Sequence, residues 1–305
     1  MTQIPDIEIR FALPDERLRA FIPAYWDIIV TGPGVVEDLL RPEWMAIRMV
    51  FSGKWSFGTH KAQLSPLTDK AILHGVATQA QWVRGTEGRV FCAAIFPMGW
   101  HRLIGGDASV YSERISPLSA VFQDDADPLF AAIESAGSLE ARIAAADAFF
   151  LDRLARTERS EISDWIECVS LAIADPECAT VEELALRVGM SQSRIARFTK
   201  RHFGFLPKKL IQRARFLRML HSMEGLSVGQ WPHFLDPQYA DQSHMIRDFK
   251  KFIGLSPTQY FAMERPLLAA VFQTLMAGIK SGEAEGMSFE EGRQVLAFRP
   301  DAPEN

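Results

Sequence analysis

The chain has 305 residues, which is long enough for two domains, and its hydrophobic content of 48% is ordinary for a globular protein. No apolar run approaches the roughly 20 residues of a membrane-spanning helix, and no signal segment opens the chain, so we expect a cytoplasmic protein with no membrane partner. The net charge of −5 gives no indication of a nucleic-acid partner by itself. Three widely spaced cysteines, Cys92, Cys168 and Cys178, exclude a disulfide framework and are predicted to be small buried residues.

Residues 1 to about 122 are predicted to form short β-strands. The segments lie at 25–30, 45–51, 54–57, 71–76, 81–84 and 90–96, and each is bounded by Gly, Pro, Asp or Thr. Many short strands at this spacing are typical of a sandwich or a barrel. Residues 96–105 then predict a short helix that closes the sheet.

The apolar period changes to that of helices from Pro128 onward. The apolar positions are Leu129, Ile133, Leu139, Ile143, Ala146, Phe150 and Leu154, and Gly137-Ser138 separates them into two helices. This stripe is either intramolecular core or a subunit contact in a homodimer, and the spacing does not separate the two. The polar segment 157–161 is the predicted linker. Ile162, Trp165, Ile166, Val169 and Ile173 then form the inner stripe of a supporting helix.

One stretch occurs twice, at 192–207 and again at 242–257, with Gln, Ser, Arg, Lys, Gly and Pro at the same offsets. Each copy follows a capping residue, Ser191 or Asp241, and each closes on a glycine three residues before a proline. The inner faces contain Ile195, Thr199, His202, Met245, Phe249 and Phe252. Both copies are therefore predicted to be short amphipathic helices with a cationic outer face.

The segment before the first copy indicates a helix-turn-helix unit. Thr180 and Glu183 form a capping box, and Gly189-Met190 makes the turn after a helix with Leu184, Ala185 and Val188 inside. The second helix of such a unit enters the major groove of DNA, where Arg and Gln read base edges. The predicted DNA-binding residues are Gln192, Ser193, Arg194, Arg197 and Lys200, and in the second copy Gln242, Ser243, His244, Arg247 and Lys250. A solvated, charged helix pair is the alternative, which the repetition in register disfavours.

A further helix, 208–223, is predicted to connect the two units. Leu210, Ala214, Leu217 and Leu220 form its apolar stripe, and Lys208, Lys209, Arg213 and Arg218 lie on its polar side. A helix of this length spans about 24 Å. With the widths of the flanking units, it places the two reading helices about one DNA turn, roughly 34 Å, apart.

Charge is distributed unevenly along the chain. Residues 176–265 contain 14 Lys and Arg against 8 Asp and Glu, a net charge of +6, whereas the remainder has 19 against 30, a net charge of −11. Positive potential is thus confined to the part predicted to meet phosphate.

The two repeats resemble the double helix-turn-helix domain of AraC-type (AraC/XylS) transcriptional regulators over roughly residues 162–262. Ala185, Gly189, Ser191, Arg197, Gly204 and Pro207 carry the resemblance in the first unit, and the run 241–244 with Arg247, Phe249, Gly254, Pro257 and Tyr260 carries it in the second. It implies seven helices, double-stranded DNA as the partner, and RNA polymerase as a further partner. The departures are Thr199 in place of the usual Phe, Phe234 and Gln238 in place of a small residue and a glycine, and Pro232 and Pro237 within a helix.

The predicted fold class is α+β with two domains. Residues 1–157 resemble the cupin-like sensor domains of some AraC-type regulators, a β-sandwich or barrel ending in a helical hairpin. Residues 158–265 form the all-α DNA-binding domain, and residues 266–305 add a helix at 267–279, expected to pack on the domain core, and a tail.

These features predict a sequence-specific transcriptional regulator, controlled by a small-molecule effector or a partner at the first domain. One alternative is a cupin-type metal enzyme fused to a DNA-binding domain, but His60, His74 and His101 are isolated, and catalytic and cofactor motifs are absent, so neither a metal nor another cofactor is predicted. The other alternative is a non-specific architectural DNA-binding protein. Five tryptophans, Trp26, Trp44, Trp55, Trp82 and Trp100, either line an effector pocket or form core.

Overall fold

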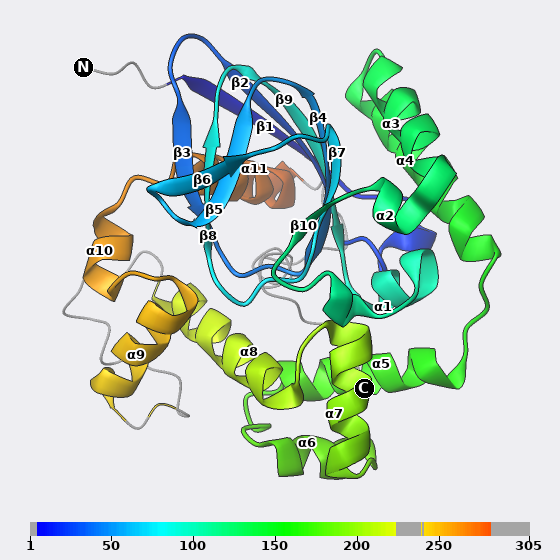
Figure 1. Cartoon of the computed structure of the whole chain (residues 1–305), viewed down its shortest axis with the longest axis vertical. Helices are drawn as coiled ribbons and strands as arrows, with labels where there is room; N and C mark the ends of the chain where they lie inside the picture. Colours follow the sequence, from blue (N-terminus) through cyan, green and yellow to red (C-terminus); the bar gives the residue numbers. More distant parts are fainter. Residues whose placement is uncertain (1–4, 224–238, 240, 282–305) are drawn as a thin grey trace.

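The computed structural model describes residues 5–223, 239 and 241–281. Figure 1 shows two parts, a β-sandwich with a helical hairpin beside it and a group of helices below it. We call them the β domain, from β1 to α4, and the helical domain, from α5 to α10. This is the predicted α+β, two-domain fold.

Two antiparallel sheets face each other in the β domain. The larger has the order β1-β2-β9-β4-β7-β10, and the smaller has the order β3-β8-β5-β6. The strands are β1 (Asp6–Ala12), β2 (Tyr25–Thr31), β3 (Val36–Leu40), β4 (Met45–Ser52), β5 (Trp55–His60), β6 (Gln63–Pro66), β7 (Ala71–His74), β8 (Gln81–Gly85), β9 (Gly88–Ile95) and β10 (Ile115–Pro117). The six predicted strands are present. The other four, β1, β3, β6 and β10, are rich in charged residues or contain proline, and each pairs with a strand already predicted.

Short helices and a hairpin cover the outer face of the larger sheet. They are α1 (Pro97–Gly99), which continues as a π-helical turn (Trp100–Ile104), α2 (Ser119–Phe122), α3 (Ala126–Ser135) and α4 (Leu139–Ala155). Ala146 and Phe150 of the hairpin are buried in one apolar cluster with Phe91 of β9. The hairpin stripe is therefore intramolecular core at these positions.

The helical domain continues that apolar cluster. Its helices are α5 (Glu161–Ala174), α6 (Val181–Val188), α7 (Gln192–Phe203), α8 (Pro207–Ser222), α9 (Gln242–Phe252) and α10 (Pro257–Ala262). Ile166 of α5 and Leu184 of α6 are fully buried in the cluster that also contains Phe91. Ile162 was predicted to lie in the inner apolar stripe of α5, and this was wrong. Its side chain is 41% exposed because it lies in the first turn of α5, beyond the residues that pack against the rest of the helix. The prediction was also wrong for Cys168, which is exposed on the outer face of the same helix, whereas Cys92 and Cys178 are buried.

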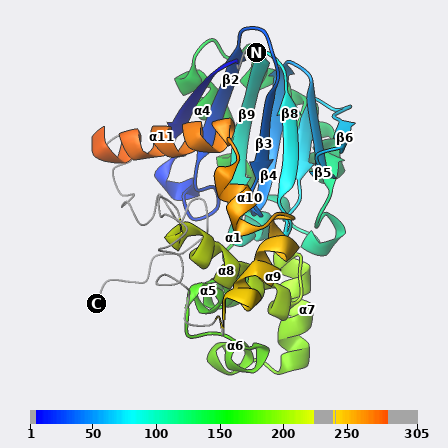
Figure 2. The same ribbon diagram turned by 90° about the vertical axis from the view of Figure 1, so that its left-hand side faces the viewer.

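The last described helix, α11 (Pro266–Ser281), returns to the β domain. Figure 2 shows it lying across the strands of the sandwich. Leu267 and Leu275 are buried with sandwich residues, and the Thr274 hydroxyl donates to the carbonyl of Ile9 at 2.9 Å. At the start of α11, the amide of Leu268 donates to Asp38 of β3 at 2.9 Å. The C-terminal segment thus ties the end of the helical domain to the sandwich core.

Candidate DNA-binding surface

The first helix-turn-helix unit has the predicted geometry. The amide of Glu183 donates to the Thr180 hydroxyl at 3.1 Å, and the amide of Thr180 donates to the Glu183 carboxylate at 2.9 Å, so both ends of the capping box are closed. Gly189 ends α6 with a φ of +68°, a left-handed conformation that favours glycine. The Ser191 hydroxyl then accepts from the amide of Arg194 at 3.3 Å and starts α7.

Helix α7 separates its apolar and polar residues onto two faces. Ile195, Thr199 and His202 are buried, while Gln192, Ser193, Arg197 and Lys200 are exposed. Thr199 is fully buried, and half-buried Phe198 packs beside it with its ring 4.6 Å from that of His202. Arg194 is exposed as well, but its guanidinium lies 5.2 Å from the ring centroid of Trp165 on α5, a cation–π contact that fixes its direction.

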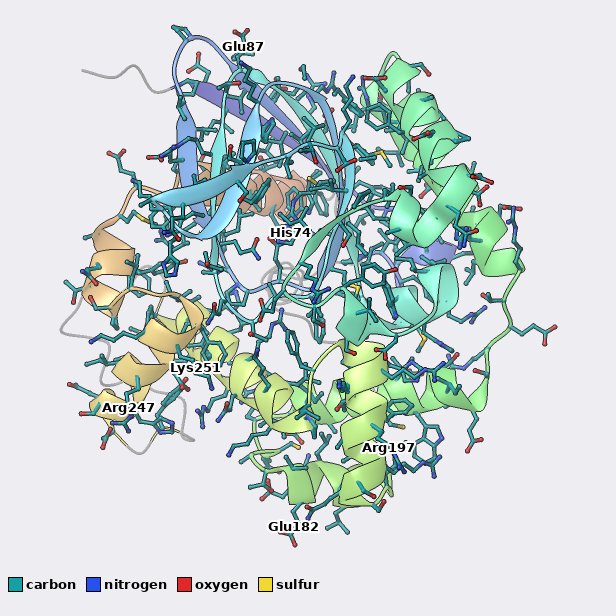
Figure 3. The ribbon with its side chains drawn as sticks, in the orientation of Figure 1. His74, Glu87, Glu182, Arg197, Arg247 and Lys251 are labelled. Carbon is teal, nitrogen blue, oxygen red and sulfur yellow. The ribbon has the colours of Figure 1, made fainter. Side chains whose placement is uncertain are left out.

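The second helix that was predicted to read DNA, α9, repeats this arrangement. Asp241 caps it by accepting from the amide of His244 at 2.7 Å. Met245, Phe249 and Phe252 are buried with Phe216 of α8 and Tyr260 of α10. Gln242, Ser243, Arg247 and Lys250 are exposed. Figure 3 shows Arg197 and Arg247 on the same end of the molecule, opposite to Glu87 of the β domain. The outer faces of α7 and α9 therefore lie at the same end of the molecule.

His244 differs from the other predicted DNA-binding residues because it is half-buried. Its Nε2 lies 3.2 Å from Nη2 of Arg215, and its ring centroid lies 5.0 Å from that of Tyr239. Arg215 also donates to buried Asp248 at 2.6 Å, and the Tyr239 hydroxyl donates to the same carboxylate at 3.1 Å. His244 is thus held by a polar cluster inside the second unit. The departures from the family pattern at Pro232, Phe234, Pro237 and Gln238 lie outside the described residues.

The connector α8 is buried on more sides than its sequence predicts. Arg213, expected on the polar side, is 3% exposed. Its Nε donates to the carbonyl of Ala77 and its Nη2 to the carbonyl of Pro42, both at 3.1 Å, and its guanidinium stacks 4.5 Å from the Trp44 ring. The polar side of α8 faces the β domain here, where backbone carbonyls of that domain replace water.

Helices α7 and α9 also contact the β domain at their C-terminal ends. The hydroxyl of Ser112 donates to the carbonyl of Gly204, the glycine that ends α7, at 2.8 Å. The amide of Ala80 donates to the carbonyl of Phe252, the last residue of α9, at 2.6 Å. The C-terminal ends of α7 and α9 are therefore docked on the β domain, while the outer faces of both helices remain exposed.

His101, isolated in the sequence, meets a histidine of α7 in space. Its ring centroid lies 5.5 Å from that of His202, nearly perpendicular, across the boundary between the β and helical domains. Burial, and then the neighbouring His101 and Arg201, lower the pKa of His202 from 6.5 to about 4, an effect that Asp107 opposes. Burial and Arg102 also lower the pKa of His101.

Acid should therefore loosen the docking of α7. Between pH 6.5 and 4, His202 is uncharged in the folded state, whereas the same histidine in the unfolded chain binds a proton. The free energy of unfolding is therefore retained above pH 6.5 and decreases as the pH falls towards 4. We expect the free energy of unfolding of His202→Gln, measured in urea from pH 7.5 to 4.5, to fall less steeply than that of the wild type. His60→Gln, at an exposed position, should follow the wild type. Equal slopes for His202→Gln and the wild type would contradict this assignment.

Histidines of the β domain do not gather into a metal site. Among the described residues, no group of three or more His, Cys, Asp or Glu side chains is placed to hold a metal ion. His74 is buried beside the Arg48 guanidinium, and burial together with that charge holds the pKa of His74 well below its ordinary value. His60 is exposed at the end of β5.

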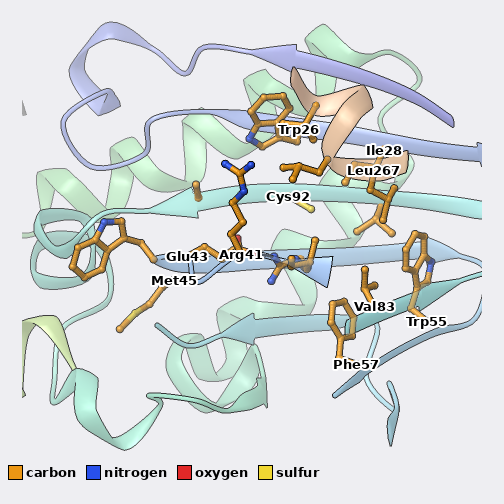
Figure 4. A pocket seen from close by; sticks show the side chains of 18 of the residues that line it. Trp26, Ile28, Arg41, Glu43, Met45, Trp55, Phe57, Val83, Cys92 and Leu267 are labelled. Carbon is orange, nitrogen blue, oxygen red and sulfur yellow. Dashed lines mark hydrogen bonds and ion pairs between the residues drawn. The ribbon is translucent and has the colours of Figure 1, made fainter. Parts of the chain in front are cut away.

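A cavity of about 180 Å³ lies between the two sheets. Figure 4 shows its walls, which include Trp26, Trp55, Phe57 and Val83. Leu267, Leu268 and Val271 of α11 also line it, and its charged lining residues are Arg41, Glu43 and Arg48. Arg41 directly follows β3 and donates from Nε to the hydroxyl of Tyr260 in α10 at 3.1 Å. Trp44 also lines the cavity, whereas Trp82 packs against the second reading unit and Trp100 lies in the core.

Comparison with known proteins agrees with the helix-turn-helix assignment. A family model described as a helix-turn-helix domain matches residues 184–263. No curated protein matches the chain. No helix among the described residues is both long and apolar enough to cross a membrane.

Several solved structures are similar to this chain over most of its length. ToxT from Vibrio cholerae, in a P21 crystal form, is 11% identical with a TM-score of 0.41, and the alignment covers 85% of this chain and 98% of ToxT. ToxT from strain SCE256 of the same organism with a bound unsaturated fatty acid is 11% identical with a TM-score of 0.39, covering 86% and 97%. The AraC-like transcriptional activator CuxR is 12% identical with a TM-score of 0.27, covering 73% and 90%.

Proposed function

We propose that α7 and α9 read two successive major-groove segments of a specific DNA site. This proceeds from the AraC-type helix-turn-helix domain, which identifies the chain as a DNA-binding transcriptional regulator. AraC-type regulators are transcription factors and not enzymes. We divide the chain into a sensor domain at 1–157, a DNA-binding domain at 158–265 and a C-terminal segment at 266–305.

The observation that carries the proposal is the matched exposure of the two reading helices. At equal offsets, Gln192 and Gln242, Ser193 and Ser243, Arg197 and Arg247, and Lys200 and Lys250 are all exposed. Arg197 and Arg247 form no ion pair with any other residue in the described part of the chain. Arginine and glutamine at such positions make bidentate contacts with guanine and adenine, which an architectural protein does not need.

Competition binding separates a specific regulator from an architectural protein. The purified full chain is exposed to a pool of random duplexes, and the enriched sequences are then competed against unselected DNA. We expect one enriched site and a preference for it of at least about 10³-fold. Equal competition by unselected DNA would contradict specific reading and favour the architectural alternative.

The cavity of the β domain supports control by a small, mostly apolar molecule. Apolar side chains and the rings of Trp26, Trp55 and Phe57 form most of its lining, and Arg41 adds a positive charge at the wall beside the ion pair of Arg48 and Glu43. An apolar cavity of about 150 Å³ is large enough to bind benzene. A ligand with an apolar body and an anionic or hydrogen-bonding head near Arg41 fits this chemistry. RNA polymerase, which the family resemblance implies, and a second copy of the chain remain proposed partners.

Filling the cavity should abolish effector binding. Val83 is 2% exposed and lines the cavity, so Val83→Phe should occupy its volume and lower ligand affinity at least about tenfold. The measurement is tryptophan fluorescence during titration with unsaturated fatty acids of increasing chain length, because Trp26 and Trp55 line the cavity. Val76→Ile, buried outside the cavity, is the matched control. Unchanged affinity of Val83→Phe in a protein that still folds would exclude this cavity as the effector site.

A further inference from the structure

A second pocket lies between the two reading helices. It is open, has a volume of about 440 Å³, and is lined by Lys200, Lys208, Lys209 and Lys251 together with Gly204, Phe205, Leu206 and Gln212. The lysines come from α7, from the first turn of α8 and from α9. The four uncharged residues complete the lining, so this lysine pocket has four positive charges and no carboxylate on its wall.

Neighbouring side chains hold two of these lysines in place. Lys251 donates from Nζ to Oε1 of Gln212 at 2.7 Å and lies 4.9 Å from the ring centroid of Phe252. Lys209 lies 4.3 Å from the ring centroid of Phe205. Partial burial lowers the pKa of Lys251, against the effect of Asp248, and the charges of Lys209 and Lys208 lower it further. An anion in the pocket would relieve this mutual repulsion.

A carboxylate from the β domain reaches one of the lysines. Oε1 of Glu113 lies 3.4 Å from Nζ of Lys209 and also accepts from the amide of Thr78 at 3.1 Å. Glu113 has a φ of +60°, which is uncommon for a residue with a side chain. The surrounding contacts therefore hold a strained residue where it presents its charge to the lysine pocket.

We propose that the lysine pocket binds phosphates of the DNA backbone between the two groove segments, and that Glu113 competes with a phosphate for Lys209. The inference rests on the proposed function, because DNA read by both α7 and α9 must pass the start of the connector between them. Phosphate contacts of this kind position the duplex without reading its sequence. The arrangement makes DNA affinity dependent on the β domain, which supplies the competing carboxylate.

The test is the salt dependence of binding by the full chain to a non-specific duplex of about 25 base pairs. Each phosphate contact contributes about 0.9 to the slope of log affinity against log salt, so one lost contact makes the fall in affinity between 50 and 200 mM salt about 3.5-fold smaller. We expect this change for Lys208→Ala and for Lys251→Ala. Lys54→Ala is the control, since Lys54 is exposed and its amide donates to Thr86 beside Glu87, at the opposite end in Figure 3.

Glu113→Gln should change binding in the opposite direction. The glutamine oxygen still accepts from Thr78, but its charge is gone, so affinity for the same duplex should rise by a factor of about 2 to 10 and the slope should increase by up to about one. Slopes of Lys208→Ala and Lys251→Ala equal to that of Lys54→Ala would overturn the phosphate site. Unchanged affinity of Glu113→Gln would overturn the competition. If the wild type bound no DNA at all, the proposed function itself would fall, and the inference with it.

Discussion

Arg213→Ala should lower the free energy of unfolding by about 2–4 kcal/mol, because two buried carbonyl groups lose their donor. Arg213 is 3% exposed and joins α8 to Ala77 and Pro42 of the β domain. Burial lowers the pKa of Arg213 to about 10, so the side chain remains charged at neutral pH, and both of its hydrogen bonds come from a charged donor. Alanine also leaves the Trp44 ring without its stacking partner.

Urea unfolding measures this effect, with two controls. Arg213→Lys keeps the charge but offers a single point donor in place of the planar fork, so its loss should be intermediate. Arg201→Ala removes the same side chain from an exposed position on α7 and should change stability by no more than about 0.5 kcal/mol. A loss below about 1 kcal/mol for Arg213→Ala would show that these contacts do not hold the two domains together.

Arg197→Ala should weaken binding to the cognate site by about 1–3 kcal/mol and relax preference at one or two base pairs. Arg197 is exposed near the middle of α7, opposite buried Ile195 and Thr199, where a guanidinium reaches a base edge. Lys200 lies one turn further on and borders the lysine pocket. Lys200→Ala should therefore weaken binding to all sequences alike and lower the salt slope by about one.

The measurement is affinity for cognate and single-base-variant DNA at several salt concentrations. Arg247→Ala and Lys250→Ala provide the matched pair in the second unit, and we expect a shallower contrast there. If Arg197→Ala lost affinity uniformly while Lys200→Ala changed base preference, the two roles would be reversed. If Arg247→Ala proved more damaging than Arg197→Ala, the second unit would be the principal reader.

Local features of the sequence were sufficient to predict the reading units. Each of these features depends only on residues within four positions of it. They are the capping box at Thr180 and Glu183, the left-handed Gly189, and the caps at Ser191 and Asp241. Their physical causes are hydrogen bonds of the first helical turn and the conformational freedom of glycine, which do not need the rest of the chain.

Long-range packing could not be predicted in the same way. Arg213 resembles a solvated residue on a polar helix face, and only the carbonyls of Ala77 and Pro42, far away in sequence, explain its burial. The pairing of His101 with His202 and of Lys209 with Glu113 likewise depends on how two domains meet. The apolar period of α11 predicted a helix, but its partners on β1 and β3 are more than 200 residues earlier.

Genome-wide footprinting of the full chain tests the central claim most directly, that two reading helices on one rigid connector recognise a specific DNA site. α8 extends over 16 residues, or about 24 Å, and with the widths of the flanking units we expect α7 and α9 to lie about one DNA turn apart. We expect a set of sharply bounded sites that share two sequence elements about 10 base pairs apart, on one face of the duplex. Featureless coverage of the genome, with no shared element, would contradict the claim.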